Sequence, residues 1–159
     1  MLGAPGVGKT SLVQRFVESR FDERYIKTLG VKIDRKHVVT PNGPASLIVW
    51  DIYGEEEELP SNRRHLRGMA GSLLVVDGTR LATAKVAEQI QQINAADGLT
   101  GPCVLMVNKS DLAGPEALAA VEAECPGLVA AADAVFLTSA LDGSNVDEAF
   151  TALAAALVG

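Results

Sequence analysis

Hydrophobic residues recur along the first third of the chain with two different periods. Within residues 9–19 they are spaced as on one face of a helix, so we expect a helix there. Residues 31–39 then alternate between apolar and polar side chains, as in a half-exposed strand. A turn at 41–44 leads into a second apolar run at 45–50, which predicts a β-hairpin closed by Asp51.

The rest of the chain alternates short apolar runs with helical patterns. The runs at 72–77, 103–107 and 134–137 are apolar almost throughout, as strands covered on both faces are. A helical pattern follows each run, and Ser144 or Asn145 can cap the last helix. The expected helices carry Val86, Ile90 and Ile93, then Leu118, Val121 and Leu128, and finally Val146, Phe150, Leu153 and Leu157.

Strands that alternate with helices predict an α/β fold with three α/β/α layers. We expect one domain over residues 1–159, built on a mostly parallel six-stranded sheet with one antiparallel edge strand. In such folds ligands bind at the carboxyl ends of the strands. The polar motifs of this chain fall at those strand ends.

The first of these motifs is a phosphate-binding loop. Residues 3–10 have the sequence Gly-Ala-Pro-Gly-Val-Gly-Lys-Thr and fit the pattern G-x-x-x-x-G-K-[ST]. Glycines let successive backbone N–H groups curl around a phosphate at the N-terminus of the next helix. Lys9 would reach the β- and γ-phosphates, and the Thr10 hydroxyl would bind Mg²⁺. The sequence thus predicts a P-loop NTPase that binds nucleotide through Gly3, Gly6, Val7, Gly8, Lys9, Thr10 and Ser11.

Two further motifs follow predicted strands. Residues 51–54 form a D-x-x-G pattern, in which Asp51 would hold Mg²⁺ and the Gly54 N–H would contact a γ-phosphate. Residues 108–111 have the sequence Asn-Lys-Ser-Asp, and a carboxylate there can accept from both the ring N–H and the amine of guanine. The base-binding candidates are Asn108, Lys109, Asp111, Ser139 and Ala140, with Ser139-Ala140 following the next strand.

Together these motifs resemble those of the Ras-superfamily small GTPases, and among them the Rab-like group. The resemblance runs from Leu2 to the final helix, and the pairs Trp50-Asp51 and Arg67-Gly68 are typical of Rab proteins. It implies that Thr28 completes the Mg²⁺ shell with Thr10 and Asp51, and that Phe21 packs across the guanine. It also implies a monomeric GTP/GDP switch that meets protein effectors and regulators through residues 22–31 and 52–68.

Glu55, Pro5 and the pair Ile52-Tyr53, which stands where the family has Thr-Ala, depart from the family pattern. Glu55 replaces the glutamine that orients the attacking water, and an ionised carboxylate can accept a hydrogen bond but cannot donate one. Pro5 stands where the family commonly has glycine, which removes one N–H near the γ-phosphate; alternatively, the position only requires a compatible φ. The catalytic set is therefore Lys9, Thr28, Gly54 and Glu55, with hydrolysis expected to be slow or partner-assisted.

The ends of the chain also differ from the family. Only Met1 and Leu2 precede the phosphate loop, so the first strand is largely missing, and we expect Met1 to be an internal residue of a fuller protein. The last residues lack the cysteines that Rab proteins use for prenyl anchors, so no lipid anchor is expected.

Composition narrows the remaining possibilities. The net charge of −6 disfavours binding to nucleic acid or to an anionic membrane, and without a leader or a long apolar segment a cytoplasmic location is expected. The two cysteines, Cys103 and Cys125, are expected to be buried or incidental thiols. The functional hypotheses are a GTP-hydrolysing switch, a GTP-binding module without useful turnover, and an ATP-dependent kinase or ATPase, which Asp111 argues against.

Overall fold

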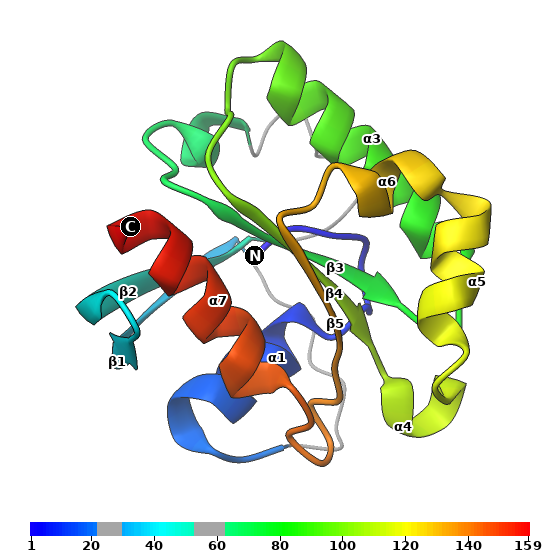
Figure 1. Ribbon diagram of the computed structural model, residues 1–159, viewed down its shortest axis with the longest axis horizontal. Coiled ribbons are helices and arrows are strands. Elements are labelled where there is room, and N and C mark those ends of the chain that lie inside the picture. The colour runs from blue at the N-terminus through cyan, green and yellow to red at the C-terminus, as the bar shows by residue number, and fades with distance from the viewer. Residues whose placement is uncertain (22–29, 53–62) are drawn as a thin grey trace.

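The computed structural model describes residues 1–21, 30–52 and 63–159 (Figure 1). It contains the predicted hairpin and the predicted alternation of strands and helices. The elements are α1 (Lys9–Glu18), β1 (Val31–Thr40), β2 (Gly43–Ile52), the short 3-10 helix η2 (Arg63–Leu66), β3 (Ser72–Asp77), α3 (Ala82–Ala96), β4 (Cys103–Asn108), α4 (Ser110–Ala113), α5 (Ala117–Glu124), α6 (Pro126–Ala130), β5 (Ala134–Leu137) and α7 (Val146–Val158).

Strands β3, β4 and β5 form a parallel sheet in that order. Helices α1 and α7 cover one face of this sheet, and α3, α5 and α6 cover the other (Figure 1). Side chains alternate between these two layers along each strand. On β3, Leu73 and Val75 join the layer with α1 and α7, whereas Leu74 and Val76 join the layer with α3 and α5. The predicted α/β fold is therefore confirmed. The predicted six-stranded sheet is not formed by the described residues, whose strands make this three-stranded parallel sheet and a separate antiparallel pair, β1 and β2.

The layer under α1 and α7 is the more aromatic of the two. The rings of Phe16 and Phe150 stack 3.9 Å apart and nearly parallel, which joins α1 to α7. Lys36 of β1 lies over the Phe16 ring at 4.2 Å, so the hairpin packs on the same cluster. This packing holds the helix that follows the phosphate loop at a fixed place against the sheet.

Strands β1 and β2 form an antiparallel hairpin with Thr40 opposite Gly43. Only Pro41 and Asn42 lie in the loop, so the second strand begins two residues earlier than the predicted turn at 41–44 allows. The strand also continues through Asp51 to Ile52 instead of ending at Asp51. The extra pairs extend the hairpin at both ends. The apolar residues of β1 do not all face the core as the alternation suggests, because Ile33 and Val39 are exposed whereas Asp34 and Lys36 are half-buried.

Residues 1 and 2 lie between the hairpin and the parallel sheet. The main-chain nitrogen of Met1 donates to the Trp50 carbonyl at 2.8 Å. Leu2 pairs with β3 in the parallel sense, through bonds of 2.9 Å to the Leu73 carbonyl and 2.8 Å from the Val75 N–H. Residues 1 and 2 thus lie beside β3 and lead the chain into the phosphate loop at the carboxyl edge of the sheet.

Two local expectations are corrected by the structure. The alanine-rich segment forms two helices, because Pro126 follows Cys125 and begins a new helix instead of continuing α5. Asn145 is the N-cap residue of α7, but its side chain makes no capping bond and donates to the Leu137 carbonyl of β5 at 2.8 Å. Asn145 therefore ties the last strand to the last helix.

The described residues include no helix that is both long and apolar enough to cross a membrane. Cys103 and Cys125 are free thiols, the first half-buried and the second buried. Burial raises the pKa of both thiols above the ordinary value.

Candidate functional site

The phosphate loop is held by side chains that bond to its carbonyl groups. Each carbonyl from residue 3 to residue 7 accepts a hydrogen bond from a side-chain nitrogen. The donors are Lys9 to Gly3 at 2.9 Å and Ala4 at 3.0 Å, Arg80 to Pro5 at 3.1 Å, Lys109 to Gly6 at 2.9 Å and Asn108 to Val7 at 3.0 Å. Because C=O and N–H point in opposite directions across a planar trans peptide, this arrangement turns the loop's amides the other way. Those amides form a concave row of donors suited to a phosphate.

Two glycines of the loop cannot be replaced without conflict. Gly3 has φ +147°, and a Cβ there would lie 2.5 Å from the Val75 carbonyl oxygen of β3. Gly8 has φ +101°, and its Cβ would lie 2.4 Å from Nδ2 of Asn108. Both contacts are too short for real atoms, so the loop can approach β3 and β4 only without side chains at these positions.

Lys9 is buried at the start of α1, with 7% of its surface exposed. Burial lowers the pKa of Lys9 to about 8, although the negative charge of Asp51 acts in the opposite direction. A cation whose charge is poorly solvated gains most from an anionic ligand. Lys9 is therefore placed to bind the phosphates of a nucleotide.

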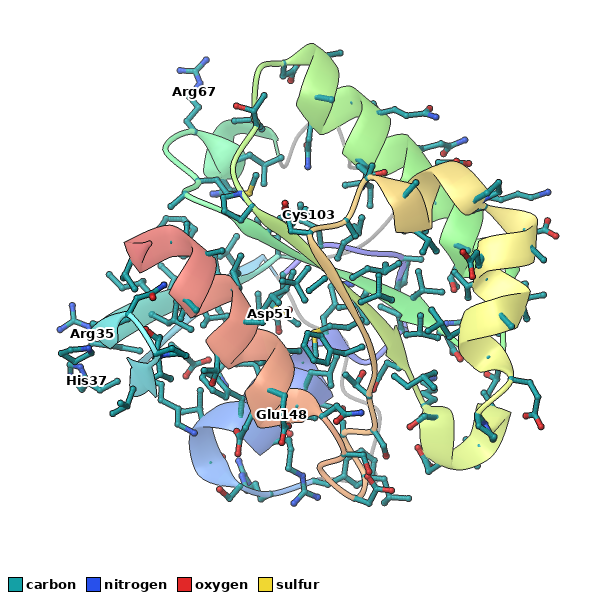
Figure 2. All side chains as sticks on the ribbon, viewed as in Figure 1. Arg35, His37, Asp51, Arg67, Cys103 and Glu148 are labelled. Carbon is teal, nitrogen blue, oxygen red and sulfur yellow. The ribbon has the colours of Figure 1, made fainter. Side chains whose placement is uncertain are left out.

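Thr10 and Asp51 meet next to the loop. The Thr10 hydroxyl donates to Oδ2 of Asp51 at 2.6 Å, which brings α1 and β2 together. Asp51 is 1% exposed and lies inside the molecule, whereas Arg35 and His37 of the same hairpin project into solvent (Figure 2). The other oxygen, Oδ1, is buried without a hydrogen-bond partner among the described residues. A buried carboxylate oxygen beside a hydroxyl fits Mg²⁺, which prefers hard oxygen ligands.

The predicted base-binding residues lie at the ends of β4 and β5. Oδ1 of Asn108 accepts from the Thr138 hydroxyl at 3.1 Å, and both side chains are buried. The hydroxyl of Ser139, also buried, donates to Asp111 at 2.8 Å. Asp111 is exposed, so its carboxylate is held by the Ser139 hydroxyl and remains accessible to a ligand from solvent. This arrangement can accept two parallel donors from a base.

Sequence reasoning missed one buried carboxylate, Asp77 at the end of β3. Its Oδ2 accepts from Lys109 Nζ at 2.8 Å and from Arg80 Nε at 2.9 Å. Its Oδ1 accepts from the main chain and the hydroxyl of Thr79. Burial alone would raise the pKa of Asp77, but these hydrogen bonds outweigh burial and lower the pKa to about 2. The sequence signal that could have identified Asp77 is its position as the polar last residue of the apolar strand at 72–77.

Arg15 of α1 was also missed. Its Nε donates to the Ala140 carbonyl at 2.8 Å, and its guanidinium also bonds to the Leu141 carbonyl. The helix that begins at the phosphate loop is thereby tied to the loop after β5. No local sequence pattern marks this contact, because 125 residues separate the two partners.

The remaining predicted residues are distributed as follows. Val7 and Ala140 are buried, and Phe21 is half-buried against the core layer under α1 and α7. Thr28, Gly54 and Glu55 lie outside the described residues. The described part of the site therefore contains the phosphate loop, Asp51 and the base-binding residues at the carboxyl ends of β4 and β5.

Comparison with known proteins decides the family. A model of the Ras family matches residues 1–158. The chain belongs to the Ras family. Within this family it resembles the Rab and Ypt proteins, and it is a Rab-like small GTPase of the GTP-binding class.

Three curated relatives illustrate this resemblance. The GTP-binding protein ypt3 of Schizosaccharomyces pombe is 30% identical over 94% of this chain and 70% of its own length. The Ras-related protein RABA1a of Arabidopsis thaliana is 32% identical over 95% of this chain and 70% of its own length. The Ras-related protein Rab-13 of Canis lupus familiaris is 35% identical over 97% of this chain and 76% of its own length. Members of this family bind guanine nucleotides with Mg²⁺ and act as GTPase switches.

Proposed function

We propose that this Ras-family protein binds GTP and GDP together with Mg²⁺ and hydrolyses GTP slowly or with the help of a partner. The observation that carries the proposal is the phosphate loop, in which each carbonyl from residue 3 to residue 7 is bonded by a side-chain nitrogen of Lys9, Arg80, Lys109 or Asn108. Such a loop presents amide donors to a polyphosphate at the positive end of α1. The nucleotide-binding residues named from the sequence are proposed on this basis.

Each part of the site has a distinct task in this proposal. Lys9 stabilises negative charge on the β- and γ-phosphates, and Asp111 selects guanine by accepting two hydrogen bonds from its edge. Thr10, Asp51 and Thr28 hold Mg²⁺, which neutralises charge on the phosphates when it is bound. Ser139 orients Asp111, and the main chain at Ala140 donates to the guanine oxygen.

Turnover depends on residues outside the described part of the chain. Glu55 stands where the family has a water-orienting glutamine, and it can accept a hydrogen bond from the water without donating one to the phosphoryl group. Gly54 would contact the γ-phosphate. We therefore propose weak intrinsic hydrolysis that a partner accelerates.

A GTP-binding module without useful turnover is the second candidate. Pro5 favours it, because proline removes one N–H from a loop that otherwise presents its amides to the phosphates. Such a protein would retain nucleotide and present its surface to a partner in one fixed state. Glu55 is compatible with both candidates.

Partner binding through residues 22–31 and 52–68 is part of the same proposal. The single-domain assignment over residues 1–159 and a monomeric state are proposed with it. A cytoplasmic location stays a prediction from the sequence.

Two measurements test the proposal. Chromatography of nucleotide released from the purified, unwashed protein should recover GDP or GTP. Single-turnover phosphate release from bound GTP should then exceed the uncatalysed rate, at least in the presence of cell extract, and Glu55→Gln should raise it. Absence of any magnesium-linked affinity for GDP or GTP would refute the proposal, whereas tight binding without phosphate release would favour the second candidate.

A further inference from the structure

One contact in the phosphate loop comes from a residue that no motif contains. Arg80 precedes α3 and lies outside the nucleotide-binding motifs of the sequence. Its Nη2 nitrogen donates to the Pro5 carbonyl at 3.1 Å. A Cβ on Gly6 would lie 3.3 Å from the same nitrogen, so the guanidinium also lies close to the next residue of the loop. Arg80 thus packs against the loop at Pro5 and Gly6.

Asp77 couples this arginine to the base end of the site. Oδ2 of Asp77 accepts from both Arg80 and Lys109, at 2.9 and 2.8 Å. The two cations bond in turn to the consecutive carbonyls of Pro5 and Gly6. One buried carboxylate oxygen therefore organises two cations, and each cation fixes one peptide group of the phosphate loop.

Pro5 gives this contact particular weight. Proline contributes no N–H, so the loop has one phosphate donor fewer than a loop with glycine at that position. The peptide that follows Pro5 carries the N–H of Gly6, and its carbonyl is the group that Arg80 holds. The Pro5 carbonyl and the Gly6 N–H belong to one planar peptide and point in opposite directions. Holding the carbonyl therefore also fixes the direction in which the Gly6 N–H can donate to a phosphate.

We propose that Arg80 is a positioning residue, held by Asp77, that fixes the peptide between Pro5 and Gly6. By fixing this peptide, Arg80 slows the dissociation of nucleoside di- and triphosphates from the protein. Arg80 acts through the loop and touches no reacting atom. This inference rests on the proposed function, because it requires the loop to bind a nucleotide. Its effect should grow with the number of phosphates that the loop contacts.

The test is the rate at which fluorescent GDP, GTP and GMP analogues dissociate from Arg80→Ala. Loss of one hydrogen bond to the loop should speed release of GDP and GTP by about three- to tenfold. Release of GMP should change by less than about twofold, because a single phosphate engages less of the loop. A general loss of stability would speed release of all three nucleotides alike and would overturn the proposal.

Two matched variants sharpen the result. Lys85 lies on α3 and pairs with Glu124 at 3.0 Å without touching the loop, so Lys85→Ala removes a nearby cation and should leave dissociation unchanged. Arg80→Lys keeps the charge, but one ammonium cannot span Asp77 and Pro5 as the two guanidinium nitrogens do, so release should stay fast. A wild-type rate in Arg80→Lys would contradict the need for both contacts.

The role of Asp77 is tested with a double-mutant cycle. Asp77→Asn should speed GDP release at least as much as Arg80→Ala, and the double variant should be no faster than Asp77→Asn alone. Additive effects would mean that Arg80 does not act through Asp77, which would overturn that part of the proposal. If the wild-type protein binds no nucleotide at all, the proposed function fails; if it binds and Arg80→Ala releases GDP at the wild-type rate, only the proposed role of Arg80 fails.

Discussion

The phosphate end and the base end of the candidate site are built from different parts of the polypeptide. At the phosphate end, residues 3–8 present main-chain amides, and side-chain nitrogens hold the carbonyls of the loop. At the base end, a side-chain carboxylate on Asp111 faces solvent and is oriented by Ser139. Substitutions at the phosphate end should therefore act through backbone shape, and those at the base end through selectivity.

Among the variants that test this contrast between the phosphate end and the base end, Gly8→Ala should have the largest effect. Its Cβ would collide with Asn108, and φ +101° is unfavourable for alanine, so GDP affinity should fall by at least about 100-fold. Calorimetric titration with GDP and Mg²⁺ measures the loss. Gly43→Ala is the matched control, because its φ is +126° but no atom lies within 4 Å of its Cβ. It should lower the melting temperature slightly and leave GDP affinity intact, and equal losses in both variants would refute the steric argument.

At the base end, Asp111→Asn should change selectivity more than stability. Replacing the carboxylate with an amide removes one acceptor and adds a donor, so GDP should bind about 10- to 100-fold more weakly and xanthosine diphosphate more tightly. Competition between the two nucleotides measures the change. Because Asp111 is exposed, the melting temperature without nucleotide should stay the same. Unchanged preference for GDP would refute the assignment of Asp111.

Proton linkage should appear at the phosphate end through Lys9. The pKa of this residue is lowered to about 8 in the free protein, and a bound polyphosphate should raise it because it favours the ammonium form. Affinity for GDP should therefore be constant below pH 8 and fall by up to about tenfold for each pH unit above it. Titration at pH 7, 8 and 9 in buffers of different ionisation enthalpy would detect the proton uptake. Affinity that rises above pH 8 would contradict the predicted sign.

The smallest effect is expected for Arg15→Ala. Its guanidinium holds the Ala140 and Leu141 carbonyls, so its loss should loosen the loop after β5 and weaken GDP and GMP alike by about two- to fivefold. This pattern is the opposite of that expected for Arg80→Ala, which should spare GMP. Arg20→Ala is the control, because Arg20 is exposed and pairs with Glu18 of α1. An Arg15→Ala defect confined to GDP would contradict the division into two ends.

Most of the architecture could be predicted from the sequence. The strands Ser72–Asp77 and Ala134–Leu137 have the predicted bounds, because short apolar runs between helices have few alternatives in an α/β protein. The predictions were weaker where two signals compete. The hairpin turn was placed over four residues, and the helix around Leu128 was not separated from α5, although Pro126 marks the break.

The sequence by itself determined the chemistry of the site. The loop at 3–10, Asp51, Asn108 and Asp111 could be named in advance, because each task allows few residue types and each motif is local. Only the tertiary structure decided how these residues are held. Asp77, Arg80 and Arg15 bond to groups far away in the chain, and a hydrogen bond between distant segments leaves no local pattern; it exists only because the fold brings the ends of β3, β4 and β5 to one edge of the sheet.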